Sequence, residues 1–171
     1  MLRVALLGGE SSGKSTLAQQ LHSGLSTQGI DVHTVPEHLR EWCERAGRAP
    51  HAHEQAAIAT EQTRLIEAAR AEVVIADTTA LVVAAYSELY FKDRSLWPAA
   101  IAAQRSMGLT LLMGLDLPWR SDGFFRDSPA VREATDALLR RELRDEPRHD
   151  LLREPPPDGP QLSAIHQSAT R

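Results

Sequence analysis

One short stretch near the N-terminus constrains the fold more than any other part of the chain. Residues 8–15 read GGESSGKS and fit the pattern G-x-x-x-x-G-K-[ST]. An apolar run at residues 3–7 precedes them, and leucines at positions 17, 21 and 25 follow at the spacing of one helix face. A strand, a glycine-rich turn and a helix form the context in which this pattern folds into a phosphate-binding loop. We therefore expect an α/β fold built around that loop.

The loop predicts a binding site for the polyphosphate of ATP. Glycines let the backbone wrap closely around phosphate groups, and the N–H groups of the loop and of the helix N-terminus face the negative charge. Within the loop, Lys14 is expected to reach the β- and γ-phosphates as a catalytic residue, and the Ser15 hydroxyl to hold Mg²⁺. The predicted nucleotide-binding residues are Gly8, Gly9, Glu10, Ser11, Ser12, Gly13, Lys14, Ser15 and Thr16.

Length and charge limit the classes of protein to consider. A chain of 171 residues suits one domain with a sheet covered on both faces, and the net charge of −4 argues against a general nucleic-acid binder. The longest apolar run, residues 80–86, is too short to span a bilayer, and no basic and apolar leader opens the chain. We expect a cytoplasmic protein whose partner is a small molecule, neither nucleic acid nor membrane. The oligomeric state stays open.

Strand and helix patterns alternate along the chain. Apolar runs predict strands at 3–7, 31–35, 73–77 and 109–113, with helices at about 37–45, 54–70, 80–91, 96–106 and 129–144. This alternation predicts a three-layer α/β fold with a mainly parallel sheet, in one domain over residues 1–144. Residues 145–171 hold five prolines and are expected to form a loose tail with at most one short strand near 150–152.

Two carboxylates follow predicted strands. The run VVIAD at residues 73–77 ends in Asp77, which suits a contact to Mg²⁺. Glu37 follows the strand at 31–35 and Pro36, so it opens onto the same edge of the sheet. We expect Glu37 to orient or deprotonate an attacking hydroxyl, with Asp77 as the rival base. The alternative for Glu37 is the first-turn acid of a helix, where the helix dipole favours a negative charge.

Other polar residues are candidates with open alternatives. The turn-rich segment 117–129 is expected to form a mobile lid. Arg126, and after it Arg132, would supply cations to the migrating phosphoryl group unless they are solvated arginines. Arg40 is either a substrate clamp or a surface helix residue. Gln62 is either a hydrogen-bonded core residue or a group that points into a pocket.

Several segments, in the right order over residues 1–144, resemble the NadR-type ribosylnicotinamide kinases. The loop with Glu-Ser-Ser at its centre resembles the family's phosphate loop, and VPEHLRE at 35–41 resembles its Glu-x-x-Arg-Glu segment. AIATEQ at 57–62 resembles its Ile-Ala-x-x-Gln helix. DLPW at 116–119 and DGFFRD at 122–127 resemble its lid. The chain departs from the family at Thr79, where the usual Asp-Thr-Asp has its second acid.

The resemblance implies a freestanding, AAA-like P-loop kinase domain with strand order 2-3-1-4-5. It also implies transfer of the γ-phosphate of ATP to the 5′-hydroxyl of nicotinamide riboside, a step of NAD biosynthesis. The residues expected on the acceptor side are Glu37, Arg40, Gln62 and Arg132. Two alternatives stay open: a kinase for another nucleoside or nucleotide, and an ATP-binding regulatory module without kinase activity.

Overall fold

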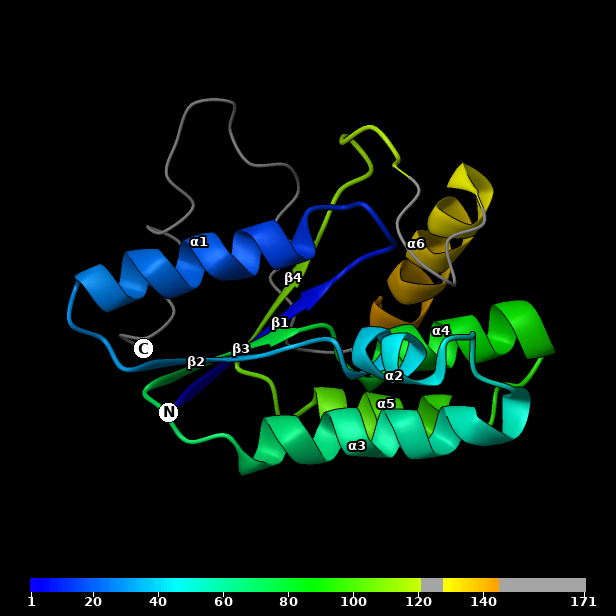
Figure 1. Ribbon diagram of the computed structural model, residues 1–171, viewed down its shortest axis with the longest axis horizontal. Helices are drawn as coiled ribbons and strands as arrows, with labels where there is room; N and C mark the ends of the chain where they lie inside the picture. The colour runs from blue at the N-terminus through cyan, green and yellow to red at the C-terminus, as the bar shows by residue number, and fades with distance from the viewer. Residues whose placement is uncertain (121–127, 145–171) are drawn as a thin grey trace.

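A parallel sheet forms the centre of the molecule. The computed structural model describes residues 1–120 and 128–144 (Figure 1). Its described strands are β1 (Leu2–Leu7), β2 (Val32–Val35), β3 (Val73–Asp77) and β4 (Leu109–Leu112). They pair in parallel in the order β2-β3-β1-β4. The first four positions of the expected order are thereby confirmed, whereas the expected fifth strand and the proline-rich tail lie outside the described residues.

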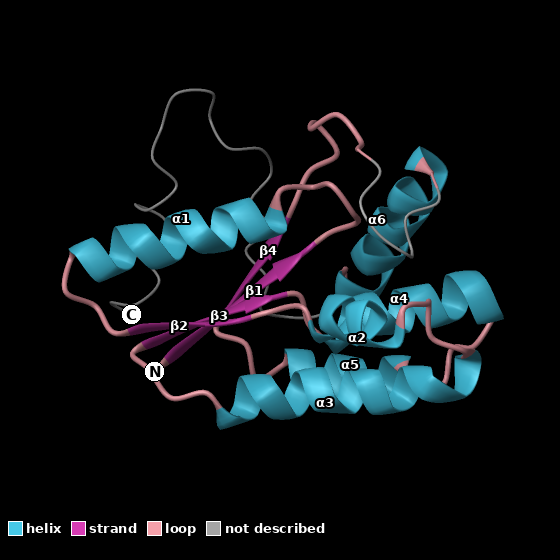
Figure 2. Ribbon diagram, viewed as in Figure 1, coloured by secondary structure: helices cyan, strands magenta, loops and turns pink. Residues whose placement is uncertain are grey.

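Helices cover both faces of this sheet, which confirms the three-layer arrangement. In Figure 2, α1 lies on one face and α3, α4 and α5 lie on the other. The helices are α1 (Lys14–Thr27), α2 (His38–Ala46), α3 (Gln55–Ala68), α4 (Ala80–Phe91), α5 (Trp97–Gln104) and α6 (Pro129–Leu143), with a short 3-10 helix, η1 (Ala52–Glu54), before α3.

The alternating faces of β1 show how the strands separate two cores. Val4 and Leu6 pack with α1, whereas Ala5 and Leu7 pack on the opposite side of the sheet. All five residues of β3 are buried, because this strand is covered on both faces. Continuous apolar runs therefore mark the central strands, and their carboxyl ends come together at one edge of the sheet.

The longest apolar run of the chain is a buried helix. Residues 80–87 of α4 are all buried, since α3, α5 and α6 pack around this helix. In the part of the chain that the structure describes, no helix has the length and apolar character needed to cross a membrane.

Two helix starts differ in how well the sequence predicts them. The helix predicted at about 54–70 corresponds to α3, which η1 precedes; Glu54, the last residue of η1, accepts hydrogen bonds from His51 N and from the Arg48 guanidinium. The helix predicted at about 129–144 starts where it was expected: Ser128 Oγ accepts from Val131 N at 3.4 Å, and Pro129 opens α6.

Candidate nucleotide-binding site

The loop between β1 and α1 has the backbone that a phosphate cradle needs. Gly13, the residue before α1, has φ 84°, a left-handed conformation that glycine adopts without strain. At Gly9, an added Cβ would lie 2.8 Å from the carbonyl oxygen of Arg132. Glycine at this position therefore lets α6 pack directly against the back of the loop.

The Lys14 ammonium is folded back over this loop. Its Nζ donates to the carbonyl oxygens of Gly8 at 3.0 Å and Gly9 at 2.9 Å. Burial lowers the pKa of Lys14, and the nearby charges of Glu37 and Asp77 oppose that effect without cancelling it. The loop thus holds a cation that an anionic ligand would stabilise.

Ser15 and Asp77, the two residues predicted to hold Mg²⁺, are in contact. Ser15 Oγ donates to Asp77 Oδ2 at 2.6 Å, and the buried Asp77 Oδ1 has no hydrogen-bond partner. A hydroxyl and a carboxylate with a vacant oxygen fit Mg²⁺, which prefers oxygen ligands and shares them with substrate phosphates. Within the described residues, no group of three or more His, Cys, Asp or Glu side chains is placed to hold a metal ion.

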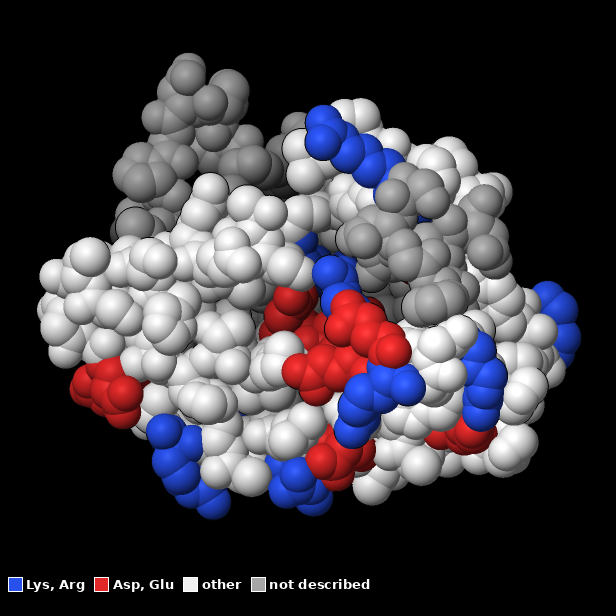
Figure 3. Space-filling model, in the orientation of Figure 1, with Lys and Arg blue, Asp and Glu red and all other residues white. Residues whose placement is uncertain are grey.

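A polar pocket of about 170 Å³ adjoins the loop, lined by residues 10–16 together with Glu37, Arg40 and Tyr86. Glu37 stands at the start of α2, and its Oε2 lies 3.4 Å from a guanidinium nitrogen of Arg40. Tyr86 comes from α4, and its hydroxyl donates to Glu10 Oε1 at 3.5 Å. In Figure 3, acidic and basic side chains intermingle near the centre of the face over α2. The structure thus brings the predicted acceptor-side carboxylate and the phosphate loop into one cavity.

Three further residues were predicted as site candidates: Gln62, Arg132 and Arg126. Gln62 takes the first of its two alternatives, because it is a buried core residue whose amide is hydrogen-bonded to backbone groups. Arg132 is not a solvated arginine: it is 5% exposed, and its Nη1 donates to the Leu117 carbonyl oxygen at 2.7 Å. Arg132 Nε and Nη2 are buried without a hydrogen-bond partner. Arg126 lies outside the described residues.

The tip of the loop is tied to the chain that follows β4. Ser11, with φ 52°, donates from Oγ to the Arg120 carbonyl oxygen at 2.6 Å, and Arg120 N lies 3.3 Å from the same Oγ. Residues 117–120 of the predicted lid therefore lie against the loop, while 121–127 are outside the described residues.

Sequence reasoning did not single out Tyr86 as a pocket residue. Because α4 is apolar and buried almost all round, its pattern distinguishes no face, and the aromatic residues of the chain looked equivalent. Thr79, which stands in place of the family's second acid, is buried, with 4% of its surface exposed. Its hydroxyl donates to Gln104 Oε1 at 2.8 Å. That position serves the core rather than the pocket.

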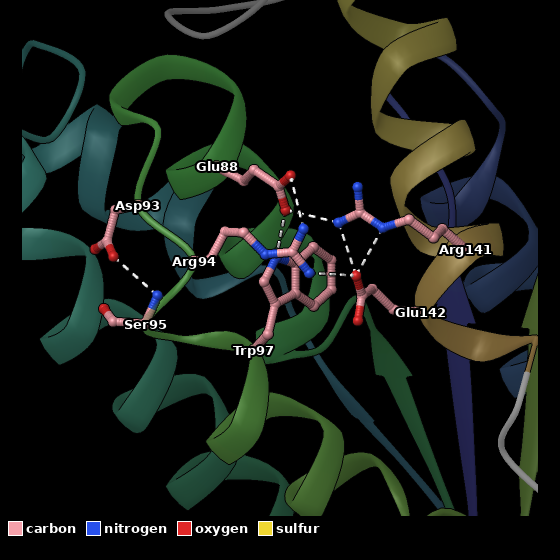
Figure 4. Close-up of polar contacts among 7 residues, drawn as sticks. All are labelled: Glu88, Asp93, Arg94, Ser95, Trp97, Arg141 and Glu142. Carbon is pink, nitrogen blue, oxygen red and sulfur yellow. Dashed lines mark hydrogen bonds and ion pairs between the residues drawn. The ribbon is translucent and has the colours of Figure 1, made fainter.

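A second charged cluster lies away from the pocket and joins α4, α5 and α6 (Figure 4). Glu88 accepts from Arg141 Nη2 at 2.8 Å and from the Trp97 indole at 2.7 Å, and Arg94 bridges Glu88 and Glu142. Partial burial acts to raise the pKa of Glu88, but the hydrogen bonds from Arg141 and Trp97 outweigh burial and hold that pKa below its usual range. Every charge in this cluster is matched by another, so its role is to fasten α6 to α4.

Comparisons with known proteins agree with this geometry. A family model described as an AAA domain matches residues 3–156. A crystal structure of a NadR protein in complex with NR has a TM-score of 0.74 at 22% identity, over 98% of this chain and 51% of that chain. A NadR protein in complex with NAD and AMP-PNP has a TM-score of 0.68 at 21% identity, over 90% of this chain and 44% of that chain.

The chain therefore spans about half the length of these two solved proteins, and their likeness concerns the fold. No curated protein matches the chain. Since the family model spans most of the sequence and includes the phosphate loop, the protein belongs to the AAA domain family and has the P-loop fold of the NadR structures.

Proposed function

We propose that this protein is an ATP-dependent kinase that transfers the γ-phosphoryl group to a hydroxyl of a small nucleoside. The observation that carries the proposal is the pocket in which loop residues 10–16 face Glu37 and Arg40. Phosphoryl transfer to a hydroxyl needs phosphates and a carboxylate next to the attacking oxygen in one cavity.

The charged and hydroxyl side chains of this region are assigned roles in the reaction. Lys14 exchanges its bonds to the loop carbonyls for phosphate oxygens and follows the charge that develops during transfer. Ser15 and Asp77 would hold Mg²⁺, which would supply positive charge to neutralise the phosphates. Glu37 orients the acceptor hydroxyl and accepts its proton, with Arg40 beside it.

Arg132 would respond to the phosphates from behind the loop. Its Nε and Nη2 are buried without a hydrogen-bond partner, its Cγ and backbone lie against Gly9, and a buried guanidinium would be stabilised by an anion at that loop. Arg126, outside the described residues, is the second cation proposed for the transferred group.

Nicotinamide riboside is the first acceptor to test. The resemblance of the loop, of residues 35–41 and of residues 57–62 supports it, as does the shared fold with a NadR protein in complex with NR.

The test is an end-point assay with Mg²⁺-ATP and a panel of nicotinamide riboside, adenosine, uridine and AMP, read by mass spectrometry. We expect equimolar ADP and phosphorylated nicotinamide riboside. If only another acceptor gives product, the protein is a kinase, but nicotinamide riboside is not its acceptor. Nucleotide binding without turnover on any acceptor would instead indicate the ATP-binding regulatory module.

A further inference from the structure

One buried side-chain amide connects the carboxyl ends of β2 and β3. Gln62 is 1% exposed, and its Oε1 accepts from His38 N at 2.7 Å. Its Nε2 donates to the Pro36 carbonyl oxygen at 3.3 Å and, at 3.5 Å, approaches the Thr78 carbonyl oxygen. The amide therefore holds the residues on both sides of Glu37 and the residue that follows Asp77.

The hydrogen bonds of this amide lie just beyond the last paired residues of β2 and β3. The register of β2 and β3 runs from Val32–Val73 to Val35–Ala76, so no ladder pair fixes Glu37 relative to Asp77. Hydrogen bonds to the two backbone groups that flank Glu37 restrict the peptide planes beside it and thereby the direction of its side chain. Gln62 thus continues the connection between the two strands past their last paired residues.

The β3 side of the connection also needs support. Thr78 has φ 83°, a left-handed conformation that is unfavourable for a β-branched residue. Such a conformation persists when its surroundings hold it in place, and it is found most often at functional sites. Thr78 N donates to the Leu6 carbonyl oxygen at 3.1 Å, and the Gln62 amide faces the carbonyl oxygen of the same residue.

We propose that Gln62 is a positioning residue that fixes the distance between the acceptor-side carboxylate of Glu37 and the metal-side carboxylate of Asp77. The inference rests on the proposed kinase function for its effect on turnover. Glutamine suits the position because one planar group carries both the acceptor for His38 N–H and the donor for the Pro36 carbonyl. An apolar side chain of similar size would take these hydrogen bonds away from two partly buried backbone groups, the His38 N–H and the Pro36 carbonyl.

The experiment compares Gln62→Met with the matched control Gln104→Met. Gln104 is also a buried amide, 2% exposed, with two partners at 2.8 Å, but it joins Thr79 and Thr110 in the core. Both variants lose a buried, hydrogen-bonded amide, with three partners at Gln62 and two at Gln104, and thermal melts measure how much stability each variant loses. We expect kcat to fall about tenfold or more in Gln62→Met, equivalent to ~1.4 kcal/mol of barrier, with the KM for ATP within about twofold. The control should keep kcat within about twofold.

A double-mutant cycle separates positioning from general damage. If Gln62 acts through Glu37, adding Gln62→Met to Glu37→Gln should lower kcat by less than about twofold more. An equal loss of kcat in both backgrounds, or an equal loss in the two methionine variants, would overturn the proposal. If Gln62→Met fails to fold, Gln62→Glu against Gln104→Glu carries the same comparison, because glutamate keeps an acceptor for His38 N–H.

A binding measurement tests the Asp77 side without turnover. The Mg²⁺ concentration that half-saturates binding of a fluorescent ADP analogue should rise severalfold in Gln62→Met and stay unchanged in Gln104→Met. An unchanged Mg²⁺ requirement in Gln62→Met would count against the proposal. If the wild-type protein phosphorylates no acceptor, the proposed function fails, and this Mg²⁺ readout alone decides the role of Gln62.

Discussion

At the scale of single residues, Lys14 is the partly buried cation of the phosphate loop, and its ammonium is bonded to the loop carbonyls of Gly8 and Gly9. Replacing it by alanine removes a cation whose contact to phosphate strengthens during transfer, so we expect kcat to fall by about 10²-fold or more. The fold should survive, because the ammonium bonds only to two carbonyls of its own loop among the described residues. Steady-state kinetics and a thermal melt check both parts. Turnover at the wild-type rate, in a preparation free of contaminating kinase, would refute the assignment.

The two strand-end carboxylates should respond differently to Mg²⁺. Glu37→Gln is expected to lower kcat sharply with ATP affinity little changed, because the lost interaction belongs to the transition state. Asp77→Asn should also raise the Mg²⁺ requirement, since its carboxylate bonds Ser15 at the metal position. Kinetics over a range of Mg²⁺ concentrations decide between the roles. The opposite pattern would mean that Asp77 serves the acceptor and Glu37 the metal. A change in kcat below about tenfold in both variants would mean that neither carboxylate has the role assigned to it.

Gln55 offers a stability test on the same helix as Gln62. It is fully buried in α3, and neither Nε2 nor Oε1 has a hydrogen-bond partner. Replacing it by leucine removes two unpaired polar groups from the core, so the free energy of unfolding should rise by about 1–3 kcal/mol. Gln104→Leu, where both amide atoms are paired, should lower it. Urea unfolding measures the change in the free energy of unfolding for each variant. A destabilised Gln55→Leu variant would show that the Gln55 amide has a role in the fold.

At the scale of elements, the ion pairs between α4 and α6 predict an acid-dependent stability. The pKa of Glu88 is lowered in the folded protein, so its contribution is present above the unfolded value near 4.5 and is lost as the pH falls through the folded value. Glu88→Gln should lower the free energy of unfolding at pH 7 by about 0.5–1 kcal/mol, a magnitude typical of screened pairs. This difference from wild type should shrink below about pH 4.5.

Denaturant unfolding at pH 7 and pH 3.5 tests that prediction, with Glu61→Gln as the control. Glu61 pairs with Arg64 within one turn of α3, so its loss detaches no second helix. An effect of Glu88→Gln that is the same at both pH values would mean that charge has no part in fastening α6.

The elements themselves were largely predictable, and the reason is local. β1 and β3 are buried on both faces, so they read as continuous apolar runs, and the glycine pattern between β1 and α1 fixes their connection. The boundaries near Glu54 were less predictable because a 3-10 turn, held by His51 and Arg48, precedes α3. The sequence pattern does not show such a turn, since its stabilising contacts are side-chain bonds.

The site was predictable only where its residues stand next to strand ends or in the loop. Lys14, Glu37 and Asp77 belong to that class. Gln62, Tyr86 and Arg132 reach the site region from helices, through contacts with segments that are distant in sequence. Periodicity places such residues on a buried face, but it does not reveal which neighbour that face meets.

At the scale of the whole molecule, ligand binding should protect the segments that border the loop. Residues 117–120 are bonded to the loop through Ser11, and residues 128–132 open α6 behind it. Hydrogen exchange in both segments should slow when an ATP analogue and the acceptor are present together, because lids close over phosphates to exclude water. Exchange that is equal in the free and ternary states would indicate that these segments do not close. The start of α1 serves as the internal reference, because its exchange should slow on nucleotide binding whether or not the segments close.

The contact between Gly9 and Arg132 has a consequence for engineering this scaffold. With the Arg132 carbonyl 2.8 Å from an added Cβ, any side chain at position 9 pushes α6 away from the loop. A library that randomises the loop alone will therefore recover little diversity at position 9. Because the nearest obstacle is a backbone oxygen, a side chain at position 9 fits only where the backbone at the start of α6 shifts as well, so the loop and α6 have to be redesigned together.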